Sequence, residues 1–184
     1  MPAAINEQII FDAALKVVTE RGYIGATTKL IAEEAGIGEV TLFRRFGSKN
    51  TLILAAIKQE AAKIDTAASV YSGELEIDLS RIATAYQLLL NARAPLIMTF
   101  YTEIKRHTEL TTVLEYPQRI IQKILVMLSR YQSEGKLIQK EPMHQLAELF
   151  GPIMMLTLFE TVYQGEAPLE IEKHIKNFLK TNRP

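Results

Sequence analysis

Hydrophobic residues in the first fifty positions recur at helical spacing, and short polar or glycine-containing segments separate them. Ile10, Ala14 and Val17 lie three or four residues apart, on one face of a helix expected over about residues 5–21. Gly22 follows at once, and glycine is favoured directly after the end of a helix. The pattern therefore predicts a first helix that ends at this glycine.

Three further helices are expected before residue 73. Thr27 is a favourable N-cap for a short helix that Gly36 ends, and a third short helix follows over about residues 39–46. Ser48 can cap a longer fourth helix, which the sequence Tyr71-Ser72-Gly73 interrupts. Two short helices joined by a glycine turn indicate a helix-turn-helix, whose second helix enters the major groove of DNA.

The rest of the chain keeps the helical spacing. Further helices are expected over residues 79–91, 96–106, 120–134, 146–163 and 171–179. Prolines 95, 117, 142 and 168 fall at or near helix starts, where proline is tolerated. The sequence thus predicts an all-α fold in three parts: a three-helix helix-turn-helix domain (residues 1–47), a connecting helix (48–72) and a larger helical domain (73–184).

The third helix has two chemically different faces. Leu42 and Phe46 are four residues apart and are expected to face the core. Val40, Thr41 and Arg44 then lie on the opposite side. A threonine hydroxyl or an arginine can bind base edges or phosphates, and a valine methyl can meet a thymine methyl.

The net charge of the chain is zero, because 21 Lys and Arg residues balance 21 Asp and Glu residues. Nucleic-acid-binding proteins usually have a basic excess, so DNA binding must come from where the cations lie. One such place is the start of the fourth helix. There Ser48 precedes free backbone amides and Lys49 adds a positive charge, which predicts a phosphate contact.

Composition also limits the chemistry. The absence of cysteine excludes disulfides, thiolate nucleophiles and cysteine metal sites, and it suits a reducing cytoplasm, where we expect the protein. No membrane span, metal site or cofactor is expected, since no apolar run is long enough and the three histidines lack metal-ligand spacing. The sequence has no glycine-rich phosphate loop and no nucleophile with a matching base, so we do not expect an enzyme.

Between Ile10 and Leu52 the sequence resembles the DNA-binding region of the tetracycline-repressor (TetR) family of bacterial regulators. The matching residues keep the family's order and gap lengths: Gly22-Tyr23, Thr27, Ile31-Ala32, Ala35-Gly36-Ile37, Thr41-Leu42-Phe43, Phe46, Ser48-Lys49 and Leu52. The resemblance implies a homodimeric transcriptional regulator that binds a palindromic operator in double-stranded DNA. It further implies a repressor that a small molecule releases, with residues 73–184 forming the ligand-binding and dimerisation domain.

The resemblance also implies which residues contact DNA. Those expected along phosphates are Thr28, Phe43, Arg44 and Lys49. Those expected near base edges are Glu39, Val40 and Thr41, with Lys29 at either. Phe43 stands where tyrosine is usual and has no hydroxyl for a phosphate. Glu39 stands where small, polar or basic residues are common, so it either reads a cytosine amino group or rejects wrong sites.

Methionine and aromatic residues are frequent in the C-terminal part and suit a cavity for a small apolar or amphipathic effector. The candidates are Met98, Tyr101, Met127, Tyr131, Met155 and Phe159. Such residues at helical spacing more often belong to an ordinary core. Two apolar stripes are expected either at a four-helix dimer interface or inside one subunit: Met155, Leu158, Phe159 and Val162, and Ile171, Ile175, Phe178 and Leu179.

One alternative function remains open at this point. A helical protein-interaction adaptor that has lost DNA binding would also be electrically neutral and would tolerate Glu39. Its basic residues would then form an ordinary solvated face.

Overall fold

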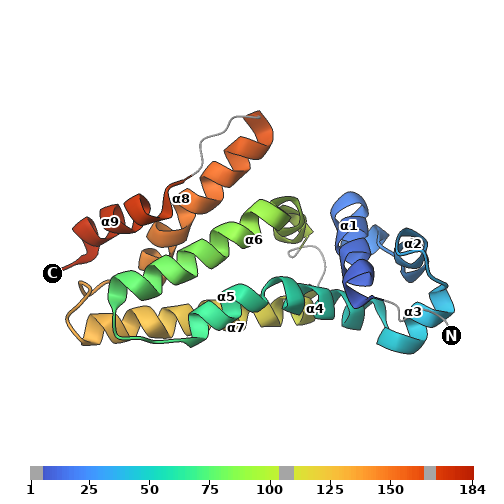
Figure 1. The fold of residues 1–184 in the computed structure, drawn as a ribbon, viewed down its shortest axis with the longest axis horizontal. Coiled ribbons are helices and arrows are strands. Elements are labelled where there is room, and N and C mark those ends of the chain that lie inside the picture. The colour runs from blue at the N-terminus through green and yellow to red at the C-terminus, as the bar shows by residue number, and fades with distance from the viewer. Residues whose placement is uncertain (1–5, 104–109, 164–168) are drawn as a thin grey trace. The chain divides into compact units, whose positions relative to one another are not determined.

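A computed structural model describes residues 6–103, 110–163 and 169–184, with 161–163 as backbone only. The regular secondary structure of these residues is entirely α-helical, which confirms the predicted fold class (Figure 1). The helices are α1 (Glu7–Gly25), α2 (Thr28–Glu34), α3 (Glu39–Phe46), α4 (Lys49–Glu60), α5 (Ala62–Ser69), α6 (Leu75–Glu103), α7 (Leu110–Ser133), α8 (Pro142–Tyr163) and α9 (Ile171–Asn182). Position 5, residues 104–106, Pro168 and the side chain of Val162 lie outside the described residues.

The chain forms two compact units. The first unit is Met1–Glu60 with Pro95–Tyr116, and the second unit is Ala61–Ala94 with Pro117–Pro184. Both α6 and α7 therefore contribute residues to each unit. The domain limits at residues 47 and 72 were drawn from expected function, and they stay a prediction.

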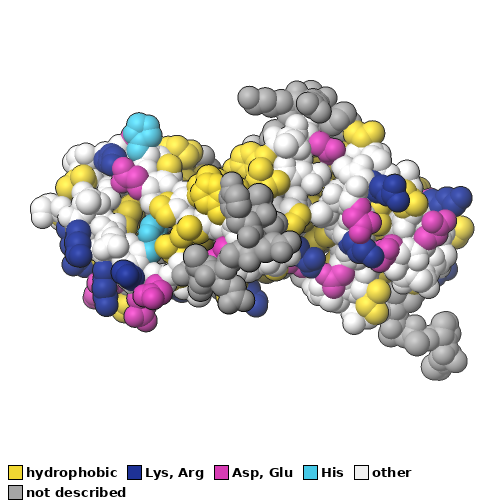
Figure 2. Space-filling model, turned by 90° about the horizontal axis from the view of Figure 1, so that it is seen from above, with side chains coloured by type: hydrophobic (Ala, Val, Ile, Leu, Met, Phe, Trp, Pro, Cys, Tyr) yellow, Lys and Arg dark blue, Asp and Glu magenta, His cyan; other side chains and the backbone are white. Residues whose placement is uncertain are grey.

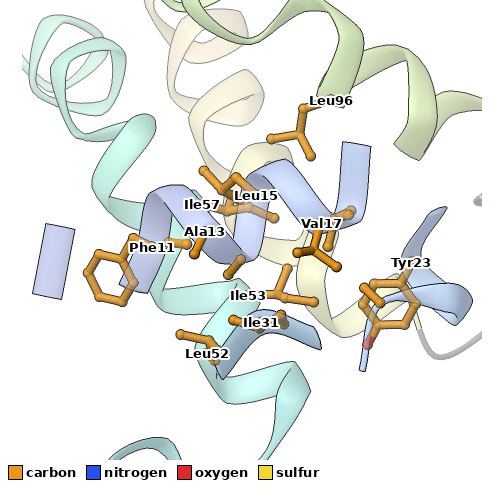
Figure 3. Close-up of a cluster of buried hydrophobic side chains, with 14 of the residues drawn as sticks. Phe11, Ala13, Leu15, Val17, Tyr23, Ile31, Leu52, Ile53, Ile57 and Leu96 are labelled. Carbon is orange, nitrogen blue, oxygen red and sulfur yellow. The ribbon is translucent and has the colours of Figure 1, made fainter. Parts of the chain in front are cut away.

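The first unit has an apolar core built from all four N-terminal helices. Ile31, Leu42 and Ile53 are fully buried, and each such side chain stabilises the fold by about 1.5–3 kcal/mol. In the close-up of Figure 3, Ile31 and Ile53 lie among side chains of α1 and α4, with Leu96 of α6 nearby. The rings of Phe11 and Phe46 lie 5.7 Å apart and join the end of α3 to α1.

The helix ends follow the local sequence. The Thr27 hydroxyl accepts a hydrogen bond from the Leu30 amide at 3.2 Å, and the Ser48 hydroxyl accepts one from the Thr51 amide at 3.1 Å. Gly22 interrupts α1 with φ of 72°, and Gly36 and Gly47 follow α2 and α3 with φ of 67° and 73°. These contacts confirm the predicted ends, although a further turn from Tyr23 to Gly25 continues beyond Gly22.

Two predicted elements differ from the structure. The fourth helix is not continuous, since α4 ends at Glu60 and α5 begins at Ala62. The helices expected over 79–91 and 96–106 are joined as α6, but the backbone at Arg93 is not helical (φ −140°, ψ 19°), so a kink separates them two residues before Pro95. Proline removes a helical hydrogen bond and crowds the turn before it, which accounts for a kink at this place.

Only some of the prolines lie at helix starts, where they were predicted. Pro142 begins α8 as expected. Pro117, however, lies inside α7, which begins at Leu110. The first turn of α7 is included because Leu110 and Val113 are buried in the core of the first unit.

The second unit contains a buried carboxylate. Asp78 is fully buried and accepts hydrogen bonds from the Ser72 amide (2.9 Å), the Ser72 hydroxyl (2.6 Å) and the Tyr131 hydroxyl (2.6 Å). Arg81 lies 2.8 Å from the same carboxylate. Burial alone would raise the pKa of Asp78, but the hydrogen bonds outweigh it and leave this pKa below its ordinary value.

The two apolar stripes have different environments. On α9, Ile175, Phe178 and Leu179 are buried within the second unit. The expectation that this stripe meets a partner is therefore wrong for these three side chains, because their own unit already covers them. On α8, Met155 and Phe159 remain 44% and 48% exposed.

No helix among the described residues is long and apolar enough to cross a bilayer.

Candidate nucleic-acid interface

The outer face of α3 carries apolar side chains that the core does not use. Val40 is 82% exposed and Phe43 is 59% exposed, whereas Leu42 on the opposite face is fully buried. Arg44 is also exposed, and Phe46 packs against the core. The predicted orientation of α3 is confirmed, while contact of this face with DNA stays a prediction.

A short connection holds α3 firmly against α2. The Ile37 amide donates to the Ala32 carbonyl at 3.0 Å, and Gly36 adopts the positive φ that this turn requires. Gly38 then caps α3, with the Thr41 amide donating to its carbonyl at 2.9 Å. The outer face of α3 is thereby fixed relative to the core below it, as a reading helix requires.

We call α1–α4 the reading head, and two of its cations form ion pairs within it. Arg45 pairs with Glu7 at 2.7 Å, and Lys16 pairs with Glu34 at 2.6 Å. The hydrogen bond to Glu34 raises the pKa of Lys16. Basic and acidic side chains are interspersed on the face that Figure 2 shows. The two pairs use two cations and two carboxylates, so the net charge of the reading head does not change.

Two cations predicted to contact DNA differ from Arg45 and Lys16 in having no carboxylate partner among the described residues. Lys29 and Arg44 are exposed, and neither has an ion-pair partner among the residues that the structure describes. A cation without a carboxylate partner is free to replace the counterions of a phosphate. The structure therefore separates the cations of the reading head into paired and unpaired ones.

Lys49 is placed differently from the expectation that it serves only as a phosphate contact. Its ammonium group donates to the Tyr23 carbonyl at 2.7 Å and lies 4.4 Å from the centre of the Tyr23 ring. Tyr23 is buried, and its hydroxyl contacts Asn50. In this arrangement Lys49 joins the start of α4 to the turn after α1.

Two other predicted site residues contact each other. The Thr28 hydroxyl donates to Oε1 of Glu39 at 2.6 Å, which connects the first residue of α2 to the first residue of α3. The sequence placed Thr28 on a phosphate and Glu39 near a base, each by itself. Their hydrogen bond could not be read from a separation of eleven positions.

A contact between α6 and the reading head was not predicted from the sequence. Oε2 of Glu103, in the last turn of α6, accepts a hydrogen bond from the Tyr23 amide at 2.7 Å. A Cβ atom added to Gly22 would lie 2.2 Å from Oε1 of Glu103. Only the glycine gave a signal, because Glu103 is eighty positions away from Tyr23.

The six candidate effector-pocket residues are divided between the two units. Met127 and Tyr131 are buried in the second unit, where the Tyr131 hydroxyl is bonded to Asp78. Met155 and Phe159 are half exposed on α8, and Met98 and Tyr101 are exposed on the part of α6 that belongs to the first unit.

An open groove of about 430 Å³ lies elsewhere in the second unit and is lined from α5, α6 and neighbouring Val70. None of the six candidates lines it. Their role therefore stays a prediction. Among the described residues, no group of three or more histidine, aspartate or glutamate side chains is placed to hold a metal ion.

Comparison with known proteins agrees with this geometry. Residues 10–56 match the family model described as bacterial regulatory proteins, tetR family. The HTH-type transcriptional regulator YvkB of Bacillus subtilis (strain 168) is 30% identical over 158 residues, which cover 85% of this chain and 83% of the relative. The matched residues thus extend well beyond the reading head.

Solved structures show the same fold across nearly the whole chain. A TetR family transcription regulator from Marinobacter aquaeolei VT8 aligns with a TM-score of 0.74 at 18% identity, covering 96% of this chain and 95% of its own. The flavonoid-responsive regulator FrrA aligns with a TM-score of 0.65 at 23% identity, covering 97% of both chains. Together with the relative from Bacillus subtilis, these matches show that the chain belongs to the tetR family of helix-turn-helix transcriptional regulators.

Proposed function

We propose that this protein is a repressor that binds a palindromic operator as a homodimer and leaves it when a small apolar or amphipathic molecule binds. The outer face of α3 is the observation that carries the proposal. It combines two exposed apolar residues, Val40 and Phe43, with the exposed cation Arg44, which has no ion-pair partner among the described residues. A major groove offers thymine methyl groups to the apolar residues and phosphates to the cation.

Each residue has a role in this proposal. Val40 and Thr41 approach base edges, and the ring of Phe43 packs along the backbone without the hydroxyl that would bind a phosphate. Lys29 and Arg44 bind phosphates, because both are exposed cations without carboxylate partners among the described residues. Lys49 contributes through the turn that it holds at Tyr23 and through its position at the start of α4.

The homodimer is proposed to form through α8. Met155 and Phe159 lie four residues apart and are half exposed, so one face of this helix has apolar area left to bury. Two copies in a symmetric dimer would place two α3 helices on half-sites about one helical turn of DNA apart, or a multiple of it. A palindromic operator matches that symmetry.

Effector release is proposed from the family likeness and from the fact that α6 and α7 contribute residues to both units. A fold neighbour is named as flavonoid-responsive, and aromatic or apolar molecules suit the methionine and aromatic residues of the second unit. The effector can release DNA only as far as it prefers a conformation with lower operator affinity. In the cell, such a repressor would work in the cytoplasm and carry no catalytic activity.

Salt dependence of DNA binding tests the proposal. An operator is first selected from a random pool of duplexes, and its affinity is then measured by fluorescence anisotropy over a range of salt concentrations. The Lys29→Ala and Arg44→Ala variants should each reduce the slope of log K against log salt by about 0.9 per protomer, for one lost phosphate contact.

The matched control is Arg45→Ala. Arg45 lies beside Arg44 on α3 but pairs with Glu7, so its removal should leave the slope nearly unchanged. If the protein binds no duplex in a salt-dependent way, or if both test variants keep the wild-type slope, the reading head does not contact phosphates as proposed.

A further inference from the structure

We propose that Glu39 determines operator specificity by accepting a hydrogen bond from the amino group of a cytosine, and that Thr28 positions its carboxylate for this contact. The inference rests on the proposed function, since it needs α3 in the major groove. It assigns Thr28 a positioning role where the family likeness would place it on a phosphate.

The geometry of the pair is the first step. Thr28 and Glu39 each begin a helix, and the 2.6 Å hydrogen bond between them crosses the turn of the helix-turn-helix. The bond uses Oε1 of Glu39 and leaves Oε2 available. Glu39 itself is exposed. One oxygen is therefore anchored by the protein while the other can accept a hydrogen bond from outside.

The chemistry of a carboxylate selects the base. An ionised carboxylate only accepts hydrogen bonds, and in the major groove only cytosine and adenine present donors. Adenine also presents the acceptor N7 beside its amino group, and guanine and thymine present acceptors at the same level of the groove. Of the four bases, cytosine alone offers a donor without a hydrogen-bond acceptor of its own in the groove.

The surroundings of Glu39 favour a contact with a hydrogen-bond donor on the DNA. No salt bridge joins it to a cation among the residues described, whereas Glu7 and Glu34 of the same reading head are paired. A carboxylate that enters the groove without a donor would lose its water and face the phosphates uncompensated. Reading cytosine and rejecting other bases are therefore two results of one contact.

Anchoring by Thr28 adds to the discrimination. A glutamate side chain has several rotamers, and fixing one before binding removes part of the entropy cost of ordering it in the complex. Glu39 also lies in the first turn of α3, where the helix dipole stabilises a negative charge. A residue that only stabilised the start of α3 would use this same dipole, so the test must separate the two roles.

Base preference in selected operators separates them. The wild-type protein and the Glu39→Gln, Thr28→Val and Glu33→Gln variants each select duplexes from a random pool, and affinities are measured for the enriched sequence and its single-base changes. Wild-type protein should enrich cytosine at one position of each half-site, and replacing it by thymine should weaken binding about tenfold per half-site.

Each variant has its own expected result. Glutamine can still accept from Thr28 but also donates, so Glu39→Gln should shift the preference at that position from cytosine towards adenine. Thr28→Val keeps the carboxylate but frees it, and should reduce the preference for cytosine about threefold while keeping its direction. Glu33→Gln removes one negative charge from α2 and should change no base preference. Circular dichroism checks that each variant is folded.

Each outcome bears on a different part of the proposal. If wild-type protein selects no sequence, the proposed function fails and the inference fails with it. If it selects a palindrome but Glu39→Gln selects the same base at every position, DNA binding stands and the role of Glu39 is overturned. A Glu39→Gln variant that melts at a lower temperature but keeps the wild-type base preference likewise overturns that role. A Thr28→Val variant identical to wild type overturns the positioning role.

Discussion

Replacing Gly22 by alanine should destabilise the first unit strongly, for two separate reasons. Gly22 has φ 72° and ψ 167°, a region that is essentially restricted to glycine and costs other residues about 1–3 kcal/mol. The new Cβ atom would also lie 2.2 Å from Oε1 of Glu103. The Glu103 side chain can swing away, but the Tyr23 amide then loses its carboxylate acceptor.

The size of the effect follows from these two parts. A hydrogen bond to a charged group contributes about 1.5–3 kcal/mol, so the two parts together amount to about 2.5–6 kcal/mol. Whole domains are commonly stable by only ~5–15 kcal/mol. The Gly22→Ala variant should therefore lose a large fraction of the stability of the first unit.

Urea denaturation followed by circular dichroism measures this at one fixed protomer concentration. The series comprises wild type, Gly22→Ala, Glu103→Ala and the double variant, with Gly36→Ala as the matched control. Gly36 also has a positive φ (67°), but nothing lies within 4 Å of an added Cβ there. Its replacement should thus cost only the backbone strain.

The double variant decides whether Glu103 takes part. In the Glu103→Ala background the hydrogen bond is already lost, so Gly22→Ala should cost about 1.5–3 kcal/mol less than in wild type. Gly36→Ala should cost the same in both backgrounds. Equal costs of Gly22→Ala in the two backgrounds would refute the role of Glu103, and a cost below about 1 kcal/mol in wild type would contradict the strain argument.

Three further predictions follow from single contacts. Because the pKa of Asp78 is lowered in the fold, its ionised form stabilises the protein above about pH 4, and this stability is lost as the pH falls further. The Asp78→Asn variant should be less stable than wild type at pH 7. In an acid titration it should lose less stability than wild type does. Leu42→Ala should cost about 2–5 kcal/mol in urea denaturation, whereas Val40→Ala on the exposed face should cost less than about 0.5 kcal/mol; equal costs would contradict the orientation of α3. Phe159→Asp should convert the proposed dimer to monomer in light scattering, while Met143→Asp near the start of α8 should leave it dimeric; a dimer that survives Phe159→Asp would exclude this face.

Features that depend on neighbours along the chain were predictable. The Thr27 and Ser48 caps act on amides three residues ahead, and the glycines after α2 and α3 relieve strain at their own positions. The orientation of α3 followed from the spacing of Leu42 and Phe46 for the same reason. Local sequence is sufficient where the stabilising contact is itself local.

Features that depend on distant contacts were not predictable from one sequence. A proline suggests a helix start, yet Pro117 lies inside α7, because Leu110 and Val113 at the start of that helix are buried in the core of the first unit. The Thr28–Glu39 bond spans eleven positions, and the Tyr23–Glu103 bond spans eighty. Spacing along the chain contains no signal for either pair, so the sequence could name most of these residues but not their partners.

Ion pairs within the reading head also affect how a chain of zero net charge can bind DNA. A net charge of zero suggests weak attraction to any polyanion, but Glu7 and Glu34 are satisfied by Arg45 and Lys16 inside the reading head. Few cations then remain for phosphates, so non-specific affinity and its salt dependence should both be modest. Discrimination between sites must consequently come from short-range contacts on α3. A carboxylate such as that of Glu39 suits this arrangement, because it weakens binding to most sequences and is compensated only where a base donates to it.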